Sequence, residues 1–274
     1  MTSHVTKVYA LGINPAETAR LRRQSEELKP EALALLDRLG LRAGQSAADL
    51  GCGPSGILDL LSRAVSPGGR VVGVDADPGH VAVARQLAGS QDLRNVEVIV
   101  ADARSTGLES DAFDLVHTRT LLVTVPQPAA VVSEMVRIAR PGGWVASQEP
   151  DAGCSLCYPA LLAWDRMLDL FQAGFGRSGA DFRIGRRLTE LLRHAGLEDV
   201  QLTVHAGSYP AGHSRRTLMP DLVRSLHPAI LELGLSDERE LADLDTAVRA
   251  HLADPRTVMM PHLMVVAWGR KPSV

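Results

Sequence analysis

Short apolar segments alternate with helical segments between Ser46 and Pro150, and this alternation restricts the chain to few folds. Repeats of strand and helix are typical of βαβ units around a parallel sheet. The apolar segments predict strands near residues 46–50, 70–75, 96–101, 113–118 and 143–149. Helices are predicted between them, near residues 55–65, 78–89 and 128–139. We therefore expect an α/β fold whose sheet is mostly parallel and carries helices on both faces.

The residues that precede this region predict a helical N-terminal cap over 1–45. Asn14 can cap the free amides of a helix start and Pro15 suits the first helical position, so a helix is expected to run to about Leu28. A second helix would begin near Pro30 and end at Gly40.

Beyond Pro150 the regular alternation stops. Helices are predicted within residues 151–180, at 185–194 and at about 237–253, and strands near 199–206 and 263–268. The polar stretch from Ala206 through His227 predicts no regular element. The main domain is therefore predicted at 46–274, with residues 151–198 and 207–260 as insertions on the side where a substrate would bind.

Composition argues against several classes of partner. The 29 Lys and Arg against 32 Asp and Glu give a formal net charge of -3, so no overall basic field favours nucleic acid. Three cysteines are too few for a disulfide framework and favour a reducing compartment. No apolar run is long enough for a signal peptide or a membrane span. We predict a cytoplasmic protein with a small-molecule substrate and no metal; a homodimer stays open.

A glycine loop follows the first predicted strand, with Gly51, Gly53 and Gly56 between that strand and a helix. Glycine is needed where the chain turns sharply and a ligand must approach the backbone without meeting a Cβ atom. The same spacing satisfies the dinucleotide pattern G-x-G-x-x-G, and Asp75 could hold a ribose in either case. The glycines alone leave an NAD-dependent oxidoreductase open.

Carboxylates beside the loop help to separate these possibilities. Asp49 would repel a pyrophosphate but suits the ammonium group of a methionine moiety, which favours S-adenosylmethionine. Asp75 and Asp102 end the second and third strands, and the fourth strand ends just after Val116. Ligands of open α/β sheets bind at the carboxyl ends of the strands, so we expect these residues to meet in one crevice.

Residues 30–150 resemble the class I methyltransferases, similar to those of ubiquinone and menaquinone biosynthesis and of natural-product tailoring. The resemblance is carried by five segments in order: Ala48-Asp49-Leu50-Gly51-Cys52-Gly53, Val71-Val72-Gly73-Val74-Asp75, Val100-Ala101-Asp102-Ala103, Phe113-Asp114-Leu115-Val116-His117, and Glu134-Met135-Val136-Arg137 through Arg140-Pro141-Gly142-Gly143-Trp144. It implies a Rossmann-like, seven-stranded, mostly parallel sheet whose last strand is antiparallel, and S-adenosyl-L-methionine as cofactor.

The resemblance also implies a cofactor site built from the loop and the strand ends. Asp75 would hold the ribose hydroxyls, Asp102 the adenine, and Tyr9 of the cap, with Arg20 or Gln24, would close over the cofactor. The full set of expected cofactor-binding residues is Tyr9, Gln24, Asp49, Gly51, Cys52, Gly53, Asp75, Ala76, Asp102, Ala103, Thr118 and Arg119.

The methyl group of S-adenosylmethionine is already activated by its positive sulfur, so the protein mainly has to align a nucleophile and exclude water. If the acceptor is a hydroxyl, a base would help, and His117 is the candidate because it lies beside the predicted site. Four other histidines would wall the substrate pocket, although packing is the commoner role for each: His205, His213, His227 and His262.

Three functions are compatible with these residues. The first is methyl transfer to an O, N or C atom of a small organic molecule in a biosynthetic reaction. The second is a protein that binds S-adenosylmethionine but catalyses a non-methylating reaction such as a cyclisation, or senses the cofactor. The third is the NAD-dependent oxidoreductase.

Two other groups of charged residues have more than one interpretation. Glu149, at the end of the fifth strand, is expected either to contact substrate or to face solvent. A cluster of basic residues could bind an anionic substrate, although such residues more often form a solvent-exposed face. The cluster consists of Arg183, Arg186, Arg187, Arg215 and Arg216.

Overall fold

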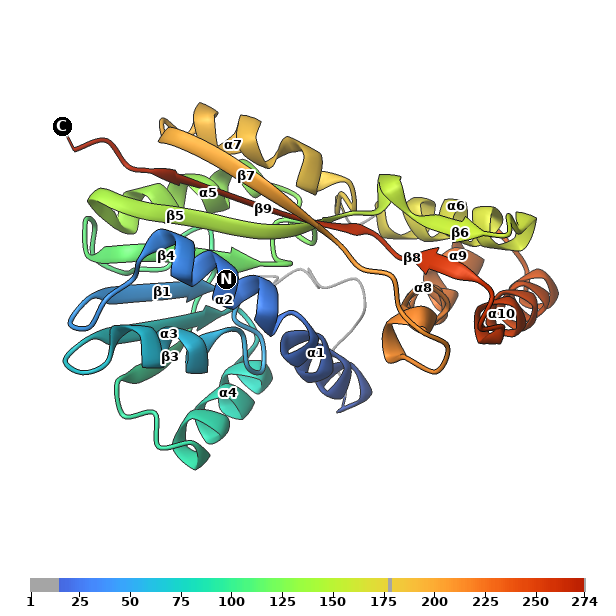
Figure 1. The fold of residues 1–274 in the computed structure, drawn as a ribbon, viewed down its shortest axis with the longest axis horizontal. Coiled ribbons are helices and arrows are strands. Elements are labelled where there is room, and N and C mark those ends of the chain that lie inside the picture. Colours follow the sequence, from blue (N-terminus) through green and yellow to red (C-terminus); the bar gives the residue numbers. More distant parts are fainter. Residues whose placement is uncertain (1–14, 177–178, 274) are drawn as a thin grey trace, which may run out of the picture.

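The computed structural model describes residues 15–176 and 179–273, and a seven-stranded sheet lies at its centre (Figure 1). The strand order is β3-β2-β1-β4-β5-β9-β7. The strands are β1 (Ser46–Leu50), β2 (Arg70–Asp75), β3 (Val96–Val100), β4 (Phe113–Arg119), β5 (Ala139–Asp151), β7 (Glu198–Ala206) and β9 (Leu263–Arg270). Neighbouring strands are parallel except where β9 pairs with β5 and with β7. The expected sheet with an antiparallel last strand is confirmed.

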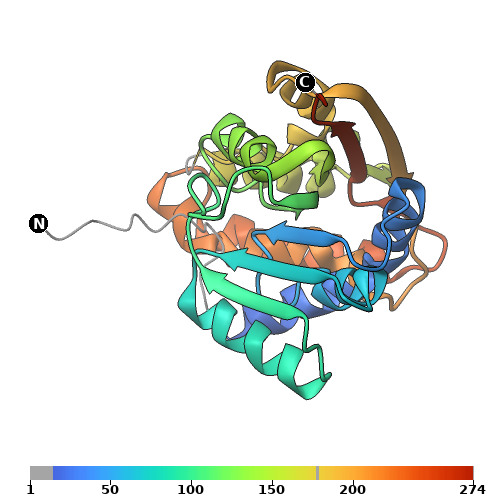
Figure 2. The same cartoon turned by 90° about the vertical axis from the view of Figure 1, so that its left-hand side faces the viewer.

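Helices cover both faces of this sheet, because successive side chains of a strand point to opposite faces. Ala47 and Leu115 pack into one apolar cluster, and Ala48 and Val116 pack into another. The first cluster is completed by α2 (Lys29–Leu39), α3 (Leu58–Val65) and α4 (Pro78–Ser90), and the second by α5 (Pro128–Ile138) and α7 (Leu188–His194). Figure 2 shows these helices on either side of the strands.

A helical lobe lies beyond the carboxyl ends of the parallel strands (Figure 1, right). It consists of α6 (Leu162–Gly176), α8 (Leu218–Ser225), α9 (His227–Glu232), α10 (Glu238–Ala253) and the two-stranded sheet of β6 (Leu156–Tyr158) and β8 (Val258–Met260). Fully buried apolar side chains, among them Trp164, Phe171 and Ile230, join the lobe to the cluster that lies under α5 and α7. The lobe therefore shares a continuous core with one face of the sheet.

The cap contributes α1 (Pro15–Glu27), which is linked to the segment just before α8. Glu27 accepts hydrogen bonds from the hydroxyl of Ser214 and, at 2.9 Å, from Nε of Arg215. Arg215 is only 5% exposed, so this ion pair is shielded from water. It ties the start of the chain to its C-terminal part.

Two stretches differ from the sequence prediction. Residues 151–180 hold more than one helix: β5 continues to Asp151, and a 3-10 turn (Ala152–Cys154) and β6 precede α6. The polar stretch that predicted no element contains a 3-10 turn (Ser214–Thr217) and α8, whose apolar side chains are buried. β6 pairs with β8 about a hundred residues away, and local patterns carry no signal for such a pairing.

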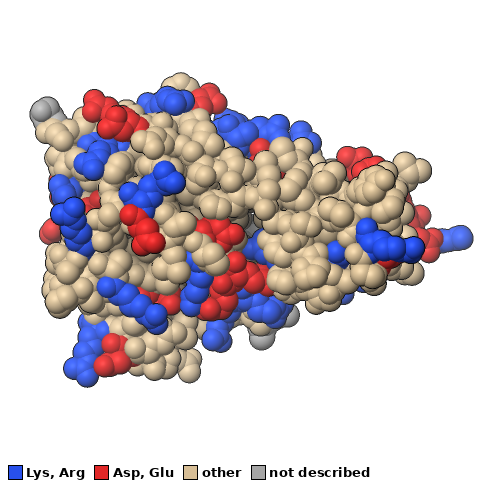
Figure 3. Space-filling view, viewed as in Figure 1, with Lys and Arg blue, Asp and Glu red and all other residues tan. Residues whose placement is uncertain are grey.

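The described helices include none that is both long and apolar enough to cross a membrane. On the face drawn in Figure 3, acidic and basic side chains are interspersed. Ion pairs join many charged side chains of the described residues, such as Arg166 with Glu240 and Arg249 with Asp221.

Candidate active site

A cavity of about 640 Å³ lies between the carboxyl ends of the strands and the helical lobe. This volume falls within the range of about 300–1,000 Å³ that is typical of small-molecule pockets. Its sheet side is lined by Gly51, Gly53, Asp75, Ala76, Asp102 and Ala103. Its lobe side is lined mainly by apolar side chains, among them Phe175, Phe182, Leu218 and Leu222. The glycine loop and the ends of β2 and β3 therefore meet in one crevice, as the sequence predicted. Asp49 is an exception, because it is only 2% exposed and does not line this cavity, where it was expected to meet the ammonium group of a ligand.

The glycine loop forms part of the cavity wall because its backbone adopts left-handed conformations. Gly51 and Gly56 have φ values of +68° and +52°. A Cβ on Gly56 would lie 2.3 Å from Oδ2 of Asp49, and one on Gly51 would lie 2.8 Å from Leu121. A Cβ on Gly53, at φ +56°, would meet nothing within 4 Å. Packing therefore requires the outer two glycines, whereas Gly53 leaves open space beside the backbone.

Asp75 connects the loop to the end of β2. Its Oδ2 accepts a hydrogen bond from the Gly53 amide at 2.8 Å, and its Oδ1 accepts one from the Asp77 amide at 2.9 Å. His80 Nδ1 lies 3.7 Å from the same Oδ1, and this contact raises the pKa of His80. The carboxylate thus has a fixed position on the cavity wall next to the loop.

Asp102 lines the same wall at the end of β3 and is about half exposed. Arg104 Nη2 donates to its Oδ2 at 2.6 Å, and this guanidinium lowers the pKa of Asp102. The carboxylate therefore stays charged, and a ligand that bonds to it would share it with Arg104.

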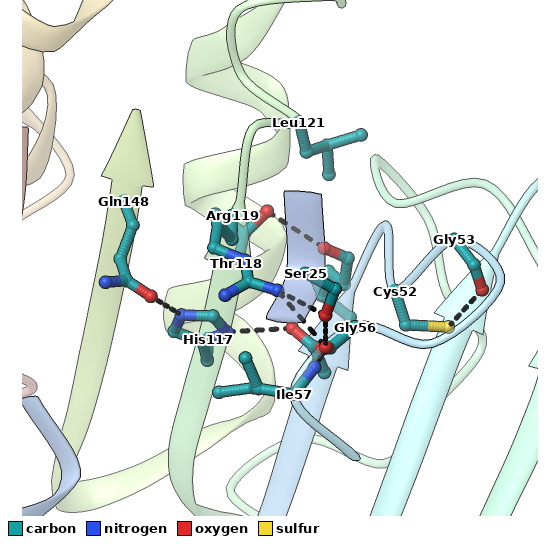
Figure 4. A network of polar contacts seen from close by, with 12 residues as sticks. Ser25, Cys52, Gly53, Gly56, Ile57, His117, Thr118, Arg119, Leu121 and Gln148 are labelled. Atoms are coloured by element: carbon teal, nitrogen blue, oxygen red, sulfur yellow. Dashed lines mark hydrogen bonds and ion pairs between the residues drawn. The ribbon is translucent and has the colours of Figure 1, made fainter. Parts of the chain in front are cut away.

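A chain of buried polar groups runs behind the loop (Figure 4). His117 Nδ1 lies 2.8 Å from Oδ1 of Asp49, and its Nε2 lies 3.0 Å from Oε1 of Gln148. Asp49 Oδ2 also accepts from the Ile57 amide at 3.1 Å. His117 has no exposed surface and does not line the cavity. Because both ring nitrogens are engaged and covered, the position of His117 argues against the predicted role as a base.

Thr118 is also placed differently from expectation. It is fully buried, does not line the cavity, and donates its hydroxyl hydrogen bond to the Leu50 carbonyl at 2.9 Å. It therefore links β4 to β1 instead of facing a ligand.

Arg119 is a partly buried cation beside the loop. Its guanidinium donates to Ser25 Oγ at 2.8 Å and to the Gly56 carbonyl at 3.1 Å (Figure 4). It also donates to the Leu28 carbonyl at 3.4 Å. It forms no ion pair with any carboxylate in the described part of the chain, and burial lowers its pKa. Arg119 lines both the main cavity and a small hollow of about 50 Å³ under the loop. A partly buried guanidinium without an ionic partner is suited to bind an anionic group of a ligand.

The other expected cofactor residues lie in different environments. Gln24 lines both the cavity and the small hollow, and its Oε1 accepts from Arg20 at 2.6 Å. Cys52 lines only the small hollow, and burial raises the pKa of its thiol well above the ordinary value. Tyr9 lies outside the described residues. None of the described His, Cys, Asp and Glu side chains form a group of three or more that could hold a metal.

Glu149 has neither of the roles that the sequence suggested. It has no exposed surface, and its carboxyl group accepts hydrogen bonds from three successive amides, at 3.1 Å from Leu121, 2.9 Å from Leu122 and 3.1 Å from Val123. Burial outweighs these donors and raises the pKa of Glu149 to about 8. Because Leu121 and Val123 line the cavity, this carboxyl group fixes one of its walls.

The predicted solvated face is wrong for two of its arginines. Arg215 and Arg216 are 5% and 3% exposed. Arg216 donates to four backbone carbonyls of the lobe, namely those of Tyr209, Leu252, Asp254 and Thr257. Sequence alone carried no signal for this role, because a carbonyl acceptor can belong to any residue.

Comparison with known proteins agrees with this geometry. Residues 48–147 match the model of a methyltransferase domain family. A demethylmenaquinone methyltransferase of Lactococcus lactis is 26% identical over 196 residues, covering 65% of this chain and 75% of that protein. Residues 48–147 therefore form a methyltransferase domain, and the comparisons support a class I S-adenosylmethionine-dependent methyltransferase. The cofactor of this family is S-adenosylmethionine, which settles the question that the glycine pattern left open.

Two further similarities place this methyltransferase among its relatives. An uncharacterized 37.1 kDa protein in transposon TN4556 of Streptomyces fradiae is 37% identical over 163 residues, covering 59% of this chain. The chain spans 46% of the length of that protein. A phosphoethanolamine N-methyltransferase 2 of Haemonchus contortus, solved with S-adenosylhomocysteine, has a TM-score of 0.57 at 19% identity. That alignment covers 89% of this chain and 52% of the other, and it shows the shared fold.

Proposed function

We propose that this methyltransferase transfers the methyl group of S-adenosylmethionine to an O, N or C atom of a small organic molecule in the cytoplasm. The observation that carries the proposal is the cavity of about 640 Å³, which has glycines and carboxylates on its sheet side and apolar side chains on its lobe side. A charged nucleoside and an apolar acceptor could lie there side by side. Such an arrangement suits a direct transfer between two bound molecules.

The residues present fit the cofactor. Gly53 leaves open space beside the backbone, and Asp75 holds a carboxylate on the same wall, where ribose hydroxyls could donate to it. Asp102 and Ala103 lie at the next strand end, where the adenine would bind. Arg119 would hold the carboxylate of the methionine part, because it is a partly buried cation on the cavity wall without an ionic partner among the described residues. When bound, the cofactor supplies a methyl group on a positively charged sulfur.

His117 and Asp49 contribute by positioning the loop. Asp49 binds the Ile57 amide with one oxygen and His117 with the other, so the start of α3 and the end of β1 are held together behind the glycines. Gln148 on β5 fixes the other side of the imidazole. This buried chain of hydrogen bonds holds the loop in place behind the cofactor site. We therefore propose that His117 positions the loop and does not act as a base.

The chain's remaining task is to exclude water from the reacting atoms. The apolar side chains of α6 and α8 that face the cavity, Phe175, Leu218 and Leu222, offer no hydrogen-bonding partner to water beside an acceptor. The segment held by Glu149 supplies the neighbouring wall. Exclusion of water favours transfer to the bound acceptor over hydrolysis.

A transfer assay tests the proposal. The purified chain is incubated with S-adenosylmethionine labelled in its methyl group and with separate phenol, quinol, amine and carbon-acid acceptors, and label is counted in the organic extract. We expect label in at least one product, and an affinity loss of about 1–3 kcal/mol for S-adenosylhomocysteine in Asp75→Asn. Cofactor binding with unlabelled but altered acceptors would instead support the non-methylating function.

A further inference from the structure

The lobe side of the cavity has a chemical character that the cofactor does not explain. Its apolar residues include Phe175, Phe182, Leu218 and Leu222, and Val123 and Pro126 of the segment after β4 continue the same apolar wall. Phe175 and Phe182 meet edge to face, with ring centroids 5.2 Å apart. A surface of this kind gains free energy by covering an apolar ring, and edge-to-face geometry is favourable between aromatic groups.

One titratable side chain lies within this apolar wall. His262, in the short connection between β8 and β9, lines the cavity and is only 8% exposed. Its ring meets the edge of Phe182 at a centroid distance of 6.1 Å. Neither ring nitrogen has a hydrogen-bond partner among the described residues, and Nδ1 is buried. Buried polar atoms are nearly always paired in folded proteins, so an unpaired imidazole in a cavity wall points to a ligand.

We propose that the lobe side is a subsite for an apolar ring that carries a hydroxyl group, and that His262 accepts the hydrogen bond of that hydroxyl and so orients the ring. This inference rests on the proposed methyl transfer, because it names the class of acceptor for the same cavity.

The surroundings keep the imidazole in the form that accepts a hydrogen bond. Burial, and secondarily the nearby charge of Arg215, lowers the pKa of His262 to about 3. The ring is therefore neutral at neutral pH and has a free lone pair for a hydroxyl donor. The same low pKa makes the ring a poor proton acceptor, so its role is to position the hydroxyl group. His80, the other described histidine on the cavity wall, contacts Asp75 on the sheet side.

A binding measurement tests the subsite without any turnover. The chain is saturated with S-adenosylhomocysteine, and 1-naphthol and naphthalene are titrated in separately, because they differ only in the hydroxyl group. We expect 1-naphthol to bind roughly 3- to 10-fold more tightly, as one hydrogen bond contributes. In His262→Leu the two affinities should become equal, whereas His205→Gln, a change outside the cavity, should keep the difference. Equal affinities in the unchanged protein would overturn the subsite.

Binding of S-adenosylhomocysteine in the same samples separates a failure of the subsite from a failure of the proposed function. His262→Gln keeps a hydrogen-bond acceptor and should therefore retain part of the preference for 1-naphthol that His262→Leu loses. Bound S-adenosylhomocysteine with equal affinities for the two ring compounds would overturn the subsite alone. Absence of S-adenosylhomocysteine binding by the unchanged protein would overturn the proposed function.

Discussion

The two sides of the cavity are built in different ways. The sheet side comes from the ends of β1, β2 and β3, within about fifty residues of chain, and uses glycines and carboxylates held by short hydrogen bonds. The lobe side comes from α6, α8 and the β8–β9 connection, which are far apart in sequence, and uses apolar contacts. The comparison suggests that local backbone geometry fixes the cofactor side, whereas the packing of distant segments shapes the acceptor side.

The largest effect is expected from a collision within the sheet side. Gly56→Ala should lower the free energy of unfolding by about 2–5 kcal/mol, because the residue is left-handed and its new methyl group would meet the Asp49 carboxylate. Gly53→Ala is the matched control, since it shares the left-handed backbone but has open space, and should cost about 1–2 kcal/mol. Urea unfolding measures both. If both variants lost the same free energy of unfolding, the close contact between residue 56 and Asp49 would not be what fixes the sheet side of the cavity.

A substitution of Arg119 tests which part of the cofactor lies next to the glycine loop on the sheet side. Arg119→Gln should weaken binding of S-adenosylhomocysteine by about 1.5–3 kcal/mol, because a charged hydrogen bond to its carboxylate is lost. Binding of 5′-methylthioadenosine, which lacks that carboxylate, should change much less. Calorimetry measures both affinities. A similar loss for both ligands would assign Arg119 to the structure of the loop and not to the cofactor.

Glu149 lies where the two sides meet, and its titration should be visible in stability. Burial raises the pKa of Glu149 to about 8 in the folded chain, from the ordinary 4.5, so between these values the folded state binds a proton that the unfolded state lacks. The contribution of Glu149 to stability should therefore be largest at low pH and should fall as pH rises through that window, by up to about 1.4 kcal/mol for each pH unit. Urea unfolding of the unchanged protein and of Glu149→Gln between pH 6.5 and 8 measures the difference. Parallel curves would show that Glu149 is already ionised at pH 6.5.

The smallest effect is expected from the lobe side, and it sharpens the comparison. Leu218→Met conserves volume on the acceptor wall, so cofactor affinity should change by less than about 0.5 kcal/mol. Affinity for 1-naphthol should change more than cofactor affinity does. Parallel titrations with S-adenosylhomocysteine and 1-naphthol measure the two changes. A larger change in cofactor affinity would mean that the two sides are not separate.

The same division explains what sequence could predict. The strand pattern and the loop at Gly51 and Gly53 are local, so the sheet and the position of Asp75 followed from neighbouring residues. Whether a side chain faces the cavity depends on packing in three dimensions, and His117 and Thr118 were therefore assigned to the site although the structure covers them. His262 reaches the cavity only because β9 and the lobe bring it there, so sequence could name it only as one of four histidines.

The most direct test of the account is the binding of S-adenosylhomocysteine to the unchanged chain, measured by calorimetry with NADH as the competing ligand. The account predicts one site per chain for S-adenosylhomocysteine and no displacement by NADH. Absence of S-adenosylhomocysteine binding, or its displacement by NADH, would contradict the assignment of the glycine loop, Asp75 and Arg119 to a methyltransferase cofactor site.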